Sequence, residues 1–351
     1  MSLPPTASDT VTISRRDVLR ALTVLPFAAA GCRQAPYRRQ DVSVPARSDV
    51  AVLRATGYTA DIADIVGRGL RELHVEVAGR RVLLKPNLVE YEPGTAINTH
   101  PAVVAGAASA LLRAGAATVV VGEGPGHRRD TEFLLTATGL YDALTSERLR
   151  FVDLNQDDVR LTPLRSRFTR LGSVALPVEV LRADLLVSMP KLKTHHWAGM
   201  TASMKNLFGT VPGAVYGFPK NVLHVQGIVP SILDLTATIR PGLAIVDAVV
   251  GMEGDGPIMG RPRSLGAIVM GTDPVAVDAT CARLIGLEPF RIEYLVEASR
   301  FLGNVSAGRI RQVGEAPERM VARFDVLDHW LPLREPLPFW RRWLIEGTRR
   351  G

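Results

Sequence analysis

The densest group of chemically capable side chains lies in one short segment. Lys191, Lys193 and His195 fall within five residues, and Lys205 and Asn206 follow closely. Ammonium groups and loop N–H donors bind phosphate or carboxylate, so this segment favours anion recognition. A lysine removed from water there can also act as a base or a nucleophile. A solvated basic loop would have the same composition, and the apolar neighbours of Asn206 favour the functional interpretation.

Acidic side chains offer a second kind of chemistry. Asp247, Glu253 and Asp255 lie in or just before one glycine-rich segment. Oxygen-rich loops bind hard cations such as Mg²⁺ or Ca²⁺, so these three carboxylates are candidate ligands of a divalent metal. Their spacing differs from that of an EF-hand, and a turn whose acids face water would have the same pattern.

The segment from Gly122 to His127 is the third candidate. Its glycines let the backbone approach a ligand closely, and Glu123 and His127 add a carboxylate and an imidazole. Two interpretations stay open, a metal site and a plain turn rich in glycine and proline. Pro125 and a run of charged residues stand where a dinucleotide fingerprint would open a helix, which excludes that kind of site.

These side chains must be positioned by an alternation of strands and helices. From residue 50 onward, short apolar β-branched runs alternate with helical patterns, which predicts βαβ units and a parallel sheet. Strands are predicted at 50–53, 81–84, 118–122, 149–152, 184–189, 243–246 and 265–270, and helices at 62–73, 101–114, 228–238 and 274–285. A capping residue followed by proline marks two of the helix starts, Thr99 or His100 before Pro101 and Asp273 before Pro274. The fold class is therefore α/β, a doubly wound, mostly parallel open sheet with helices on both faces.

The polar candidates follow the predicted strands directly. Ligands of open parallel sheets bind beyond the carboxyl ends of the strands, so residues at these ends are the first candidates for a site. Five strands are followed by such groups: Lys85 with Asn87, Glu123, Asp153 with Asn155, Lys191 to His195, and Asp247. We expect one site there, with substrate-binding residues Lys85, Asn87, Lys191, Lys205 and Asn206 and catalytic residues Lys193, His195 and Glu123.

Composition excludes several classes of protein. The chain has 351 residues, 46% of them hydrophobic, which is enough to bury a large core. Its net charge of +7 is spread along the chain without a basic stripe between aromatics, so we expect an anionic ligand or lipid as partner and no nucleic acid. The two cysteines, Cys32 and Cys281, exclude a disulfide scaffold and an iron–sulfur cluster ligated by this chain alone. Cys281 is expected to be an inert core thiol.

The N-terminal residues have the pattern of an export signal. Arg15 and Arg16 precede an apolar run over 21–31, which resembles a twin-arginine signal and is too short to cross a bilayer. Two processing sites stay open: a lipobox-like site that would lipidate Cys32, and an Ala-x-Ala site that would leave it a plain thiol. We expect a signal at 1–31, a tether at 32–48, an α/β domain at 49–329, and a location in the periplasm or on the outer face of the cell envelope.

The C-terminal residues 330–351 form a basic aromatic tail. Trp340 and Trp343 stand beside Arg341 and Arg342, a combination that interfacial membrane segments use. An extended segment folded back over the domain would have a similar composition, and both interpretations stay open.

Taken in order, the motifs resemble the DUF362 family, which is uncharacterised. The resemblance covers about residues 50–286 and is carried by segments 84–88, 98–101, 121–124, 189–195, 205–209, Asp247 with 253–257, and 273–278. Many members resembling this chain carry ferredoxin-like iron–sulfur clusters. This chain lacks their cysteine run, so we exclude electron transfer through a cluster of its own.

Two functions stay open from the sequence. The first is an exported enzyme that acts on a small anionic molecule, and the second is a non-catalytic ligand-binding or cofactor-assembly protein, with a redox protein as a candidate partner. An enzyme is favoured if Glu123 and His127 lie on the same side of the pocket as Lys193.

Overall fold

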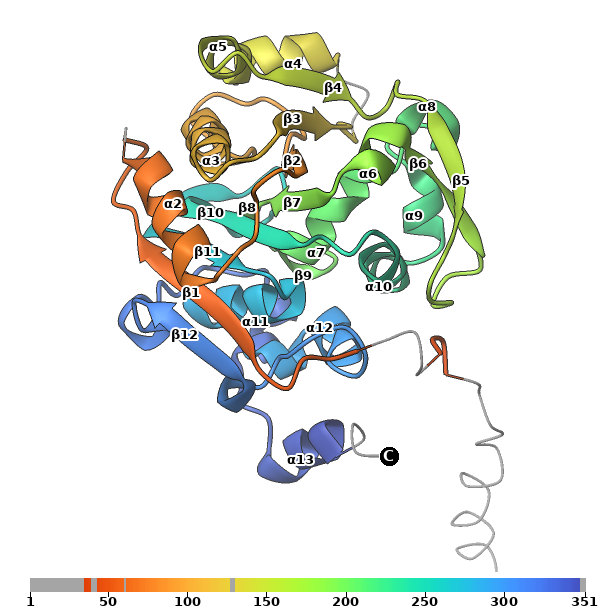
Figure 1. Cartoon of the computed structure of the whole chain (residues 1–351). Helices are drawn as coiled ribbons and strands as arrows, with labels where there is room; N and C mark the ends of the chain where they lie inside the picture. The colour runs from red at the N-terminus through yellow and green to blue at the C-terminus, as the bar shows by residue number, and fades with distance from the viewer. Residues whose placement is uncertain (1–34, 39–42, 60, 127–129, 348–351) are drawn as a thin grey trace, which may run out of the picture. The chain divides into compact units, whose positions relative to one another are not determined.

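The computed structural model describes residues 35–38, 43–59, 61–126 and 130–347. The described residues from Tyr37 onward belong to one compact unit. A large mixed sheet lies at its centre, and helices cover both faces of that sheet (Figure 1). The twin-arginine motif and Cys32 lie outside the described residues.

The sheet is mostly parallel, as the sequence predicts. Its strands follow the order β12 (Ile310–Gly314), β1 (Ser48–Arg54), β11 (Arg261–Gly271), β10 (Leu243–Glu253), β7 (Leu185–Met189), β2 (Arg81–Pro86), β3 (Thr118–Glu123) and β4 (Arg150–Asp153). The five strands from β10 to β4 run parallel to one another, and β11 runs antiparallel to both of its neighbours. A short strand, β8 (Lys191–His195), pairs with β10 and with β9 (Gly199–Thr201).

The order of the strands identifies where a ligand should bind. The chain runs outward from β2 through β3 to β4, and then returns to place β7 on the other side of β2. The winding reverses between β2 and β7, and open α/β sheets bind ligands in the crevice outside the carboxyl ends of the strands at such a point. The residues after β2 and β7 therefore border the expected site.

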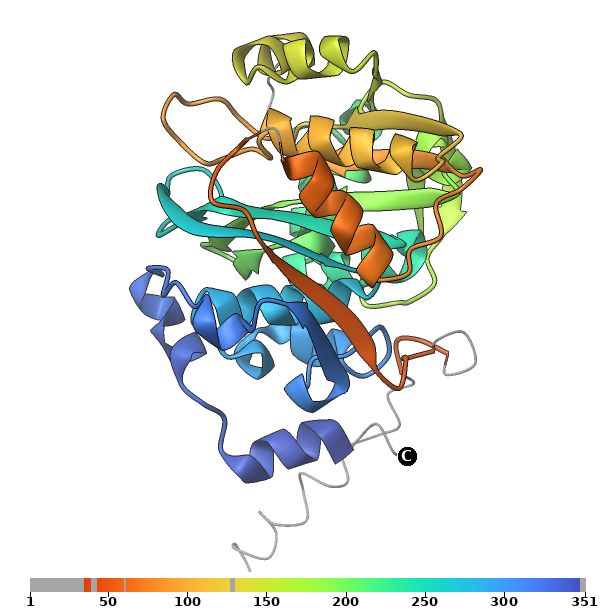
Figure 2. The ribbon, with the colours of Figure 1, turned by 60° about the vertical axis from the view of Figure 1, so that its left-hand side comes forward.

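The helices form two layers with separate apolar cores. One face of the sheet packs against α2 (Ile62–Glu72), α3 (Pro101–Arg113), α4 (Thr131–Ala137) and α5 (Leu140–Ser146). The other face packs against α6 (Val178–Arg182), α7 (Ser203–Asn206), α10 (Ile228–Ile239), α11 (Pro274–Leu284) and α12 (Glu293–Ala298), as Figures 1 and 2 show. Alternate residues of β1 serve the two cores, because side chains along a strand point to opposite faces.

Two predicted helix starts are confirmed in detail. The Nδ1 atom of His100 accepts the N–H of Ala102 at 3.2 Å, and Pro101 occupies the first helical position of α3. The carboxylate of Asp273 accepts the N–H of Val275 at 2.9 Å in the same way at the start of α11. These contacts satisfy donors that have no partner within a helix, so the chain begins each helix at a defined residue.

The structure also contains elements that the sequence pattern did not indicate. The hairpin of β5 (Val159–Pro163) and β6 (Ser173–Pro177) and the edge strand β12 were not predicted. Segment 191–195, interpreted above as a loop, is the buried strand β8, and Glu253 ends β10 instead of lying in a glycine-rich loop. Short helices complete the chain: η2 (Leu207–Thr210), α8 (Gly213–Tyr216), α9 (Asn221–Val225), η3 (Pro289–Arg291), η4 (Ala307–Arg309), η5 (Pro317–Arg319), η6 (Asp328–Arg334) and α13 (Phe339–Gly347).

The described part of the C-terminal segment folds back over the domain, which is one of the two interpretations left open by the sequence, and its last helix exposes two tryptophans. Leu333 in η6 is buried, and the indole N–H of Trp330 donates to the carbonyl of His196 at 3.0 Å, so this part folds back over the domain. In α13, Trp340 and Trp343 are exposed. Among the described residues, no helix has both the length and the apolar character needed to cross a bilayer.

Candidate functional site

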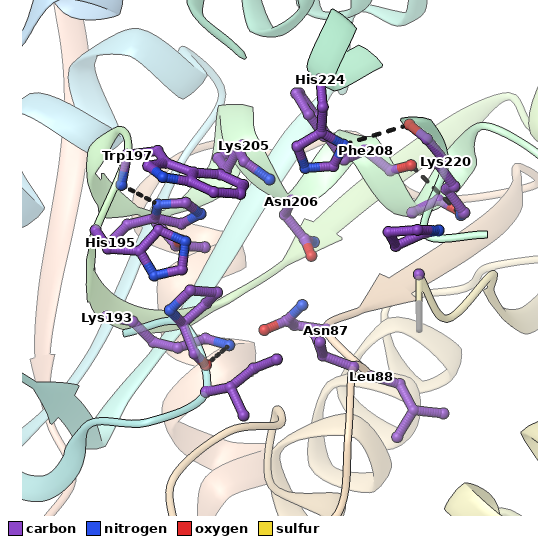
Figure 3. Close-up of a pocket in the computed structure, with 18 of the residues that line it drawn as sticks. Asn87, Leu88, Lys193, His195, Trp197, Lys205, Asn206, Phe208, Lys220 and His224 are labelled. Atoms are coloured by element: carbon purple, nitrogen blue, oxygen red, sulfur yellow. Dashed lines mark hydrogen bonds between the residues drawn. The ribbon is translucent and has the colours of Figure 1, made fainter. Parts of the chain in front are cut away.

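A cavity of about 500 Å³ opens beyond the carboxyl end of β2, beside the point where the winding reverses (Figure 3). Asn87 enters it from the segment after β2, and Glu123 from the end of β3. β8 contributes Lys193 and His195, and the α7–η2 segment contributes Lys205 among others. Cavities of this size commonly hold small organic molecules.

All five lysines of the chain lie at this cavity or directly behind its wall. Lysine accounts for only five of the 42 Lys and Arg residues, so the basic residues elsewhere in the chain are arginines. Lys193, Lys205 and Lys220 line the cavity, whereas Lys85 and Lys191 lie behind it. Arginine stays charged and presents a broad planar fork, whereas lysine has a compact amine that can lose its proton. The cavity wall therefore holds amines that can change their protonation state, whereas most basic residues of the chain cannot.

Lys191 is neutralised by its own buried partners. Its Nζ atom lies 2.6 Å from the Asp247 carboxylate and 2.8 Å from the hydroxyl of Tyr58, and it donates to the carbonyl of Val250 at 3.0 Å. The same carboxylate accepts the backbone N–H of His100 at 2.9 Å. Every strong donor in this group is satisfied, and Lys191 does not line the cavity, so the structure does not bring it together with the other expected substrate-binding residues.

Lys85 and Glu123 form a second buried ion pair. The Lys85 amine also donates to Oδ1 of Asn206 at 3.1 Å, and the Asn206 amide donates to the hydroxyl of Ser188 at 3.1 Å. Burial raises the pKa of Glu123 and lowers that of Lys85, while the attraction between them opposes both shifts. This network fixes Asn206 and Glu123 at the cavity wall, so Lys85 acts behind the wall and not on a ligand directly.

Three further lysines face the cavity, and none of them forms an ion pair with a carboxylate in the described part of the chain. Lys193 donates to the carbonyl of Pro257 at 3.2 Å, and Lys220 donates to the carbonyl of Gly124 at 2.5 Å. Lys205 packs its amine 3.7 Å from the centre of the Phe208 ring. Burial lowers the pKa of Lys193 well below its usual value and that of Lys205 and Lys220 to about 7, and repulsion between lysines adds to each shift. An anionic ligand beside these amines would oppose both effects, because its negative charge favours the protonated form of lysine.

His195 presents a neutral donor to the same cavity. Its Nδ1 atom accepts the N–H groups of Trp197 at 3.0 Å and Ala198 at 3.2 Å, which assigns the proton to Nε2. Burial first, and then the nearby Lys205, lower the pKa of His195 well below its usual value. The ring is therefore neutral at pH 7, with one N–H available for hydrogen bonding.

Two buried polar atoms in the cavity wall have no partner. Asn87 Oδ1 and Thr201 Oγ1 make no hydrogen bond to any residue that the structure describes, although both side chains are more than nine-tenths buried. An unsatisfied buried polar atom costs about 1 to 3 kcal/mol, so such atoms usually meet a ligand or a water molecule. Together with the lysines, they outline a polar subsite inside the cavity.

The three carboxylates predicted to bind a metal are not brought together. The Asp247 carboxylate pairs with Lys191. The Glu253 carboxylate accepts hydrogen bonds from the Arg261 side chain and from the backbone N–H of Asp325, each at 2.9 Å. The Asp255 carboxylate lies 3.4 Å from Nδ1 of His196. No cluster of three or more His, Cys, Asp or Glu residues in the described ranges could hold a metal ion. The structure does not support the expected metal site, because cations or backbone donors already occupy these carboxylates. His127 lies outside the described residues.

Sequence reasoning missed several residues of the wall. Lys220 follows Pro219 in a loop far from any predicted strand end, and it adopts a left-handed backbone conformation with φ of 64°. Such a conformation is unfavourable for a residue other than glycine, and strained residues of this kind are enriched at functional sites. The rarity of lysine in the chain is the signal that could have identified it. Thr201, Trp197 and His224 also line the cavity.

The chain is similar to proteins of one family and to two solved structures. The family described as "Domain of unknown function (DUF362)" matches residues 82–283. A thylakoid-associated protein from Synechocystis sp. is 29% identical over 265 residues, which cover 72% of this chain and 76% of that protein. The lactate racemase apoprotein from Thermoanaerobacterium thermosaccharolyticum is 12% identical with a TM-score of 0.45, over 72% of this chain and 61% of that one. A Thermotoga maritima protein has a TM-score of 0.34 and 15% identity, over 62% of this chain and 58% of that one.

Proposed function

The chain belongs to the DUF362 family, and we propose that its cavity binds a small organic anion and acts on it as an enzyme. The excess of buried positive charge carries this proposal. Lys193, Lys205 and Lys220 line the cavity, and Glu123, the buried carboxylate in its wall, already pairs with Lys85. Burying unpaired ammonium groups is unfavourable, so a site that holds three of them is suited to an anion.

Two kinds of side chain in the cavity wall indicate what the ligand is. The three lysines, with Asn87 and Thr201, supply donors and acceptors for a carboxylate or phosphate group. Apolar side chains complete the wall, among them Leu88, Trp197, Phe208 and Ile258. A ligand with an anionic head and a compact apolar or aromatic body would suit both kinds of side chain.

Catalysis is supported by an acid and a base in one wall. His195 is a neutral N–H donor, and Lys205, with a pKa of about 7, is in part an uncharged amine at neutral pH. Groups whose pKa values lie near the working pH are efficient in proton transfer. Glu123 lines the same cavity as Lys193, which supports an enzyme, while His127, the other residue of that criterion, lies outside the described residues.

Benzoate and benzamide provide a direct test of anion binding. The two molecules have nearly the same shape, but only benzoate is charged. We expect benzoate to raise the melting temperature of the full chain and benzamide to leave it unchanged, because ligands that bind only the folded state stabilise it. Lys193→Met and Lys220→Met should lose the benzoate effect, whereas Arg113→Met, which removes an exposed cation, should keep it. Equal shifts with the two ligands would contradict the proposal.

We also propose that the chain is exported and lies at a membrane surface. Trp340 and Trp343 are 57% and 63% exposed, while Arg342 on the same helix turns toward Glu288 and Ile345 packs against the core. The helix thus presents aromatic side chains outward, as interfacial helices do. Association of the Synechocystis relative with thylakoids, stated in its name, supports the same location. Lipidation of Cys32 would supply a second membrane contact.

Vesicle sedimentation tests this location. The full chain should sediment with vesicles that contain anionic lipid, and Trp340→Ala with Trp343→Ala should weaken the binding. Leu161→Ala, which removes an equally exposed apolar side chain from β5, should not change it. Mass spectrometry of the protein from its own membranes, compared with Cys32→Ser, tests lipidation.

A further inference from the structure

We propose that Lys205 is a nucleophilic amine that forms an imine with a carbonyl compound bound in the cavity. The inference rests on the anion-binding function proposed above and names its substrate class. The substrate would be an aldehyde or ketone that also carries a carboxylate or a phosphate.

The contacts of Lys205 distinguish it from the other four lysines. Lys85 and Lys191 pair with carboxylates, and Lys193 and Lys220 donate to backbone carbonyls. Within the described residues, the Lys205 amine forms no hydrogen bond or ion pair, and it lies over the Phe208 ring. Its side chain extends into the cavity toward Asn206 (Figure 3). An amine held this way keeps its lone pair available to a ligand.

The neighbours of Lys205 favour its uncharged form. Burial and the charge of Lys85 lower its pKa to about 7, so close to half of the amine is unprotonated at pH 7. An amine shifted in this way by an apolar environment and a nearby cation is the usual form of a lysine nucleophile. Phe208 supplies the apolar surface, and Lys193 stays available for the anionic group of the ligand.

The reaction balances without an oxidant or a reductant. The Lys205 lone pair bonds to the carbonyl carbon while the π electrons move to oxygen, and a proton passes from nitrogen to that oxygen to give a carbinolamine. The hydroxyl then takes up the proton that the Lys205 ammonium released when it became the free amine, the nitrogen lone pair forms the C=N bond, the carbon–oxygen bond breaks and water leaves. Overall, a lysine ammonium and a carbonyl give a protonated imine and water. The Nε2–H of His195 lines the same cavity and can hydrogen-bond to the departing oxygen.

The composition of the chain makes this inference easy to test. With only five lysines, four of them at most 3% exposed, reagents for amines have few targets besides the chain terminus. The probe is 4-formylbenzoate, an aldehyde that carries a carboxylate, used on the full chain with sodium cyanoborohydride to reduce any imine. Peptide mapping by mass spectrometry then locates the added carboxybenzyl group.

We expect the carboxybenzyl group on Lys205 at pH 7. Neutral benzaldehyde should label it at least about tenfold more slowly, because it lacks the anion that the cavity binds. Lys205→Arg should abolish labelling of this peptide, since arginine remains protonated at neutral pH. Labelling at the terminal amine serves as an internal standard for reagent activity.

Three results would overturn the inference in different ways. Faster labelling of Lys193 or Lys220 than of Lys205 would assign the nucleophile to another residue. A benzoate-induced rise in melting temperature without an adduct would exclude imine chemistry and leave the anion-binding function intact. Absence of both effects would remove the proposed function and the imine together.

Discussion

Lys191 and Lys193 are two residues apart on β8, and they differ in what surrounds them. Lys191 lies opposite Asp247 in the ladder and pairs with it, whereas Lys193 lies opposite Met252 and faces the cavity. In a regular strand, these two side chains would point to the same face. The register of β10 shifts between Asp247 and Met252, and this irregularity directs the two lysines to different environments.

The comparison distinguishes Lys191, whose charge is balanced within the fold, from the cavity lysines, whose charge is not. The Lys191 group has an opposite charge and hydrogen bonds within the fold, so it needs no ligand. The cavity lysines have no ion-pair partner among the described residues and remain unfavourable until an anion binds. Proteins keep unfavourable groups of this kind mostly at functional sites.

The largest expected effect is the loss of stability when the buried ion pair of Lys191 and Asp247 is broken. Lys191→Met should reduce the free energy of unfolding by about 3 to 5 kcal/mol, because it leaves the buried Asp247 carboxylate without its cation. Urea denaturation measures the change. Adding Asp247→Asn should recover most of the loss, since an amide carries no charge. A loss that persists in the double variant would mean that packing, and not charge, holds Lys191 in place.

A smaller loss is expected where the cavity wall is crowded. Gly209→Ala would place its Cβ against the Glu123 carboxylate and the Lys85 amine, which should cost about 1 to 3 kcal/mol of unfolding free energy. Gly126→Ala is the matched control, because Gly126 lines the same cavity and a Cβ there meets nothing within 4 Å. Similar stabilities for the two variants would show that the Lys85 and Glu123 network can move freely.

Replacing a cavity lysine should change the free energy of unfolding in the opposite direction to replacing Lys191. Lys205→Met should leave the unliganded protein more stable by about 1 kcal/mol, because removing an uncompensated buried ammonium outweighs the lost contact with Phe208. Urea denaturation without ligand measures it, and benzoate should no longer raise the melting temperature. Destabilisation as large as that of Lys191→Met would erase the distinction between the two groups.

The smallest expected effect is a change with pH in the stability difference between Lys205→Met and the wild type. The pKa of Lys205 falls from 10.5 to about 7 on folding, so between these values the unfolded chain binds more protons and stability rises with pH. The free-energy cost of burying the Lys205 ammonium is therefore complete below pH 7 and shrinks above it. The advantage of Lys205→Met over the wild type should therefore narrow from pH 7 to 9, by less than about 1 kcal/mol per pH unit. Above pH 9, the raised pKa of buried Cys281 lowers the stability of both proteins alike, so it does not change their difference.

Much of the fold and part of the site could be predicted from local patterns. Apolar periodicity located the seven predicted strands and the long helices, and proline after a capping residue located the starts of α3 and α11. The rule that polar groups follow strand ends brought Asn87, Glu123 and Lys193 to the cavity. The same rule failed for Asp247, whose position after an apolar run does not reveal that a lysine already pairs with it.

The sequence by itself determined the α/β class, the family and the set of reactive residue types, because periodicity, capping and motif order are local properties of the chain. Tertiary structure alone decided that β11 runs antiparallel, that β8 is a strand, and that Lys220 joins the site from a distant loop. It also decided which lysines have a counter-charge. The physical reason is that strand pairing and the burial of a charge depend on residues far apart in the sequence, whose contacts exist only in the folded chain.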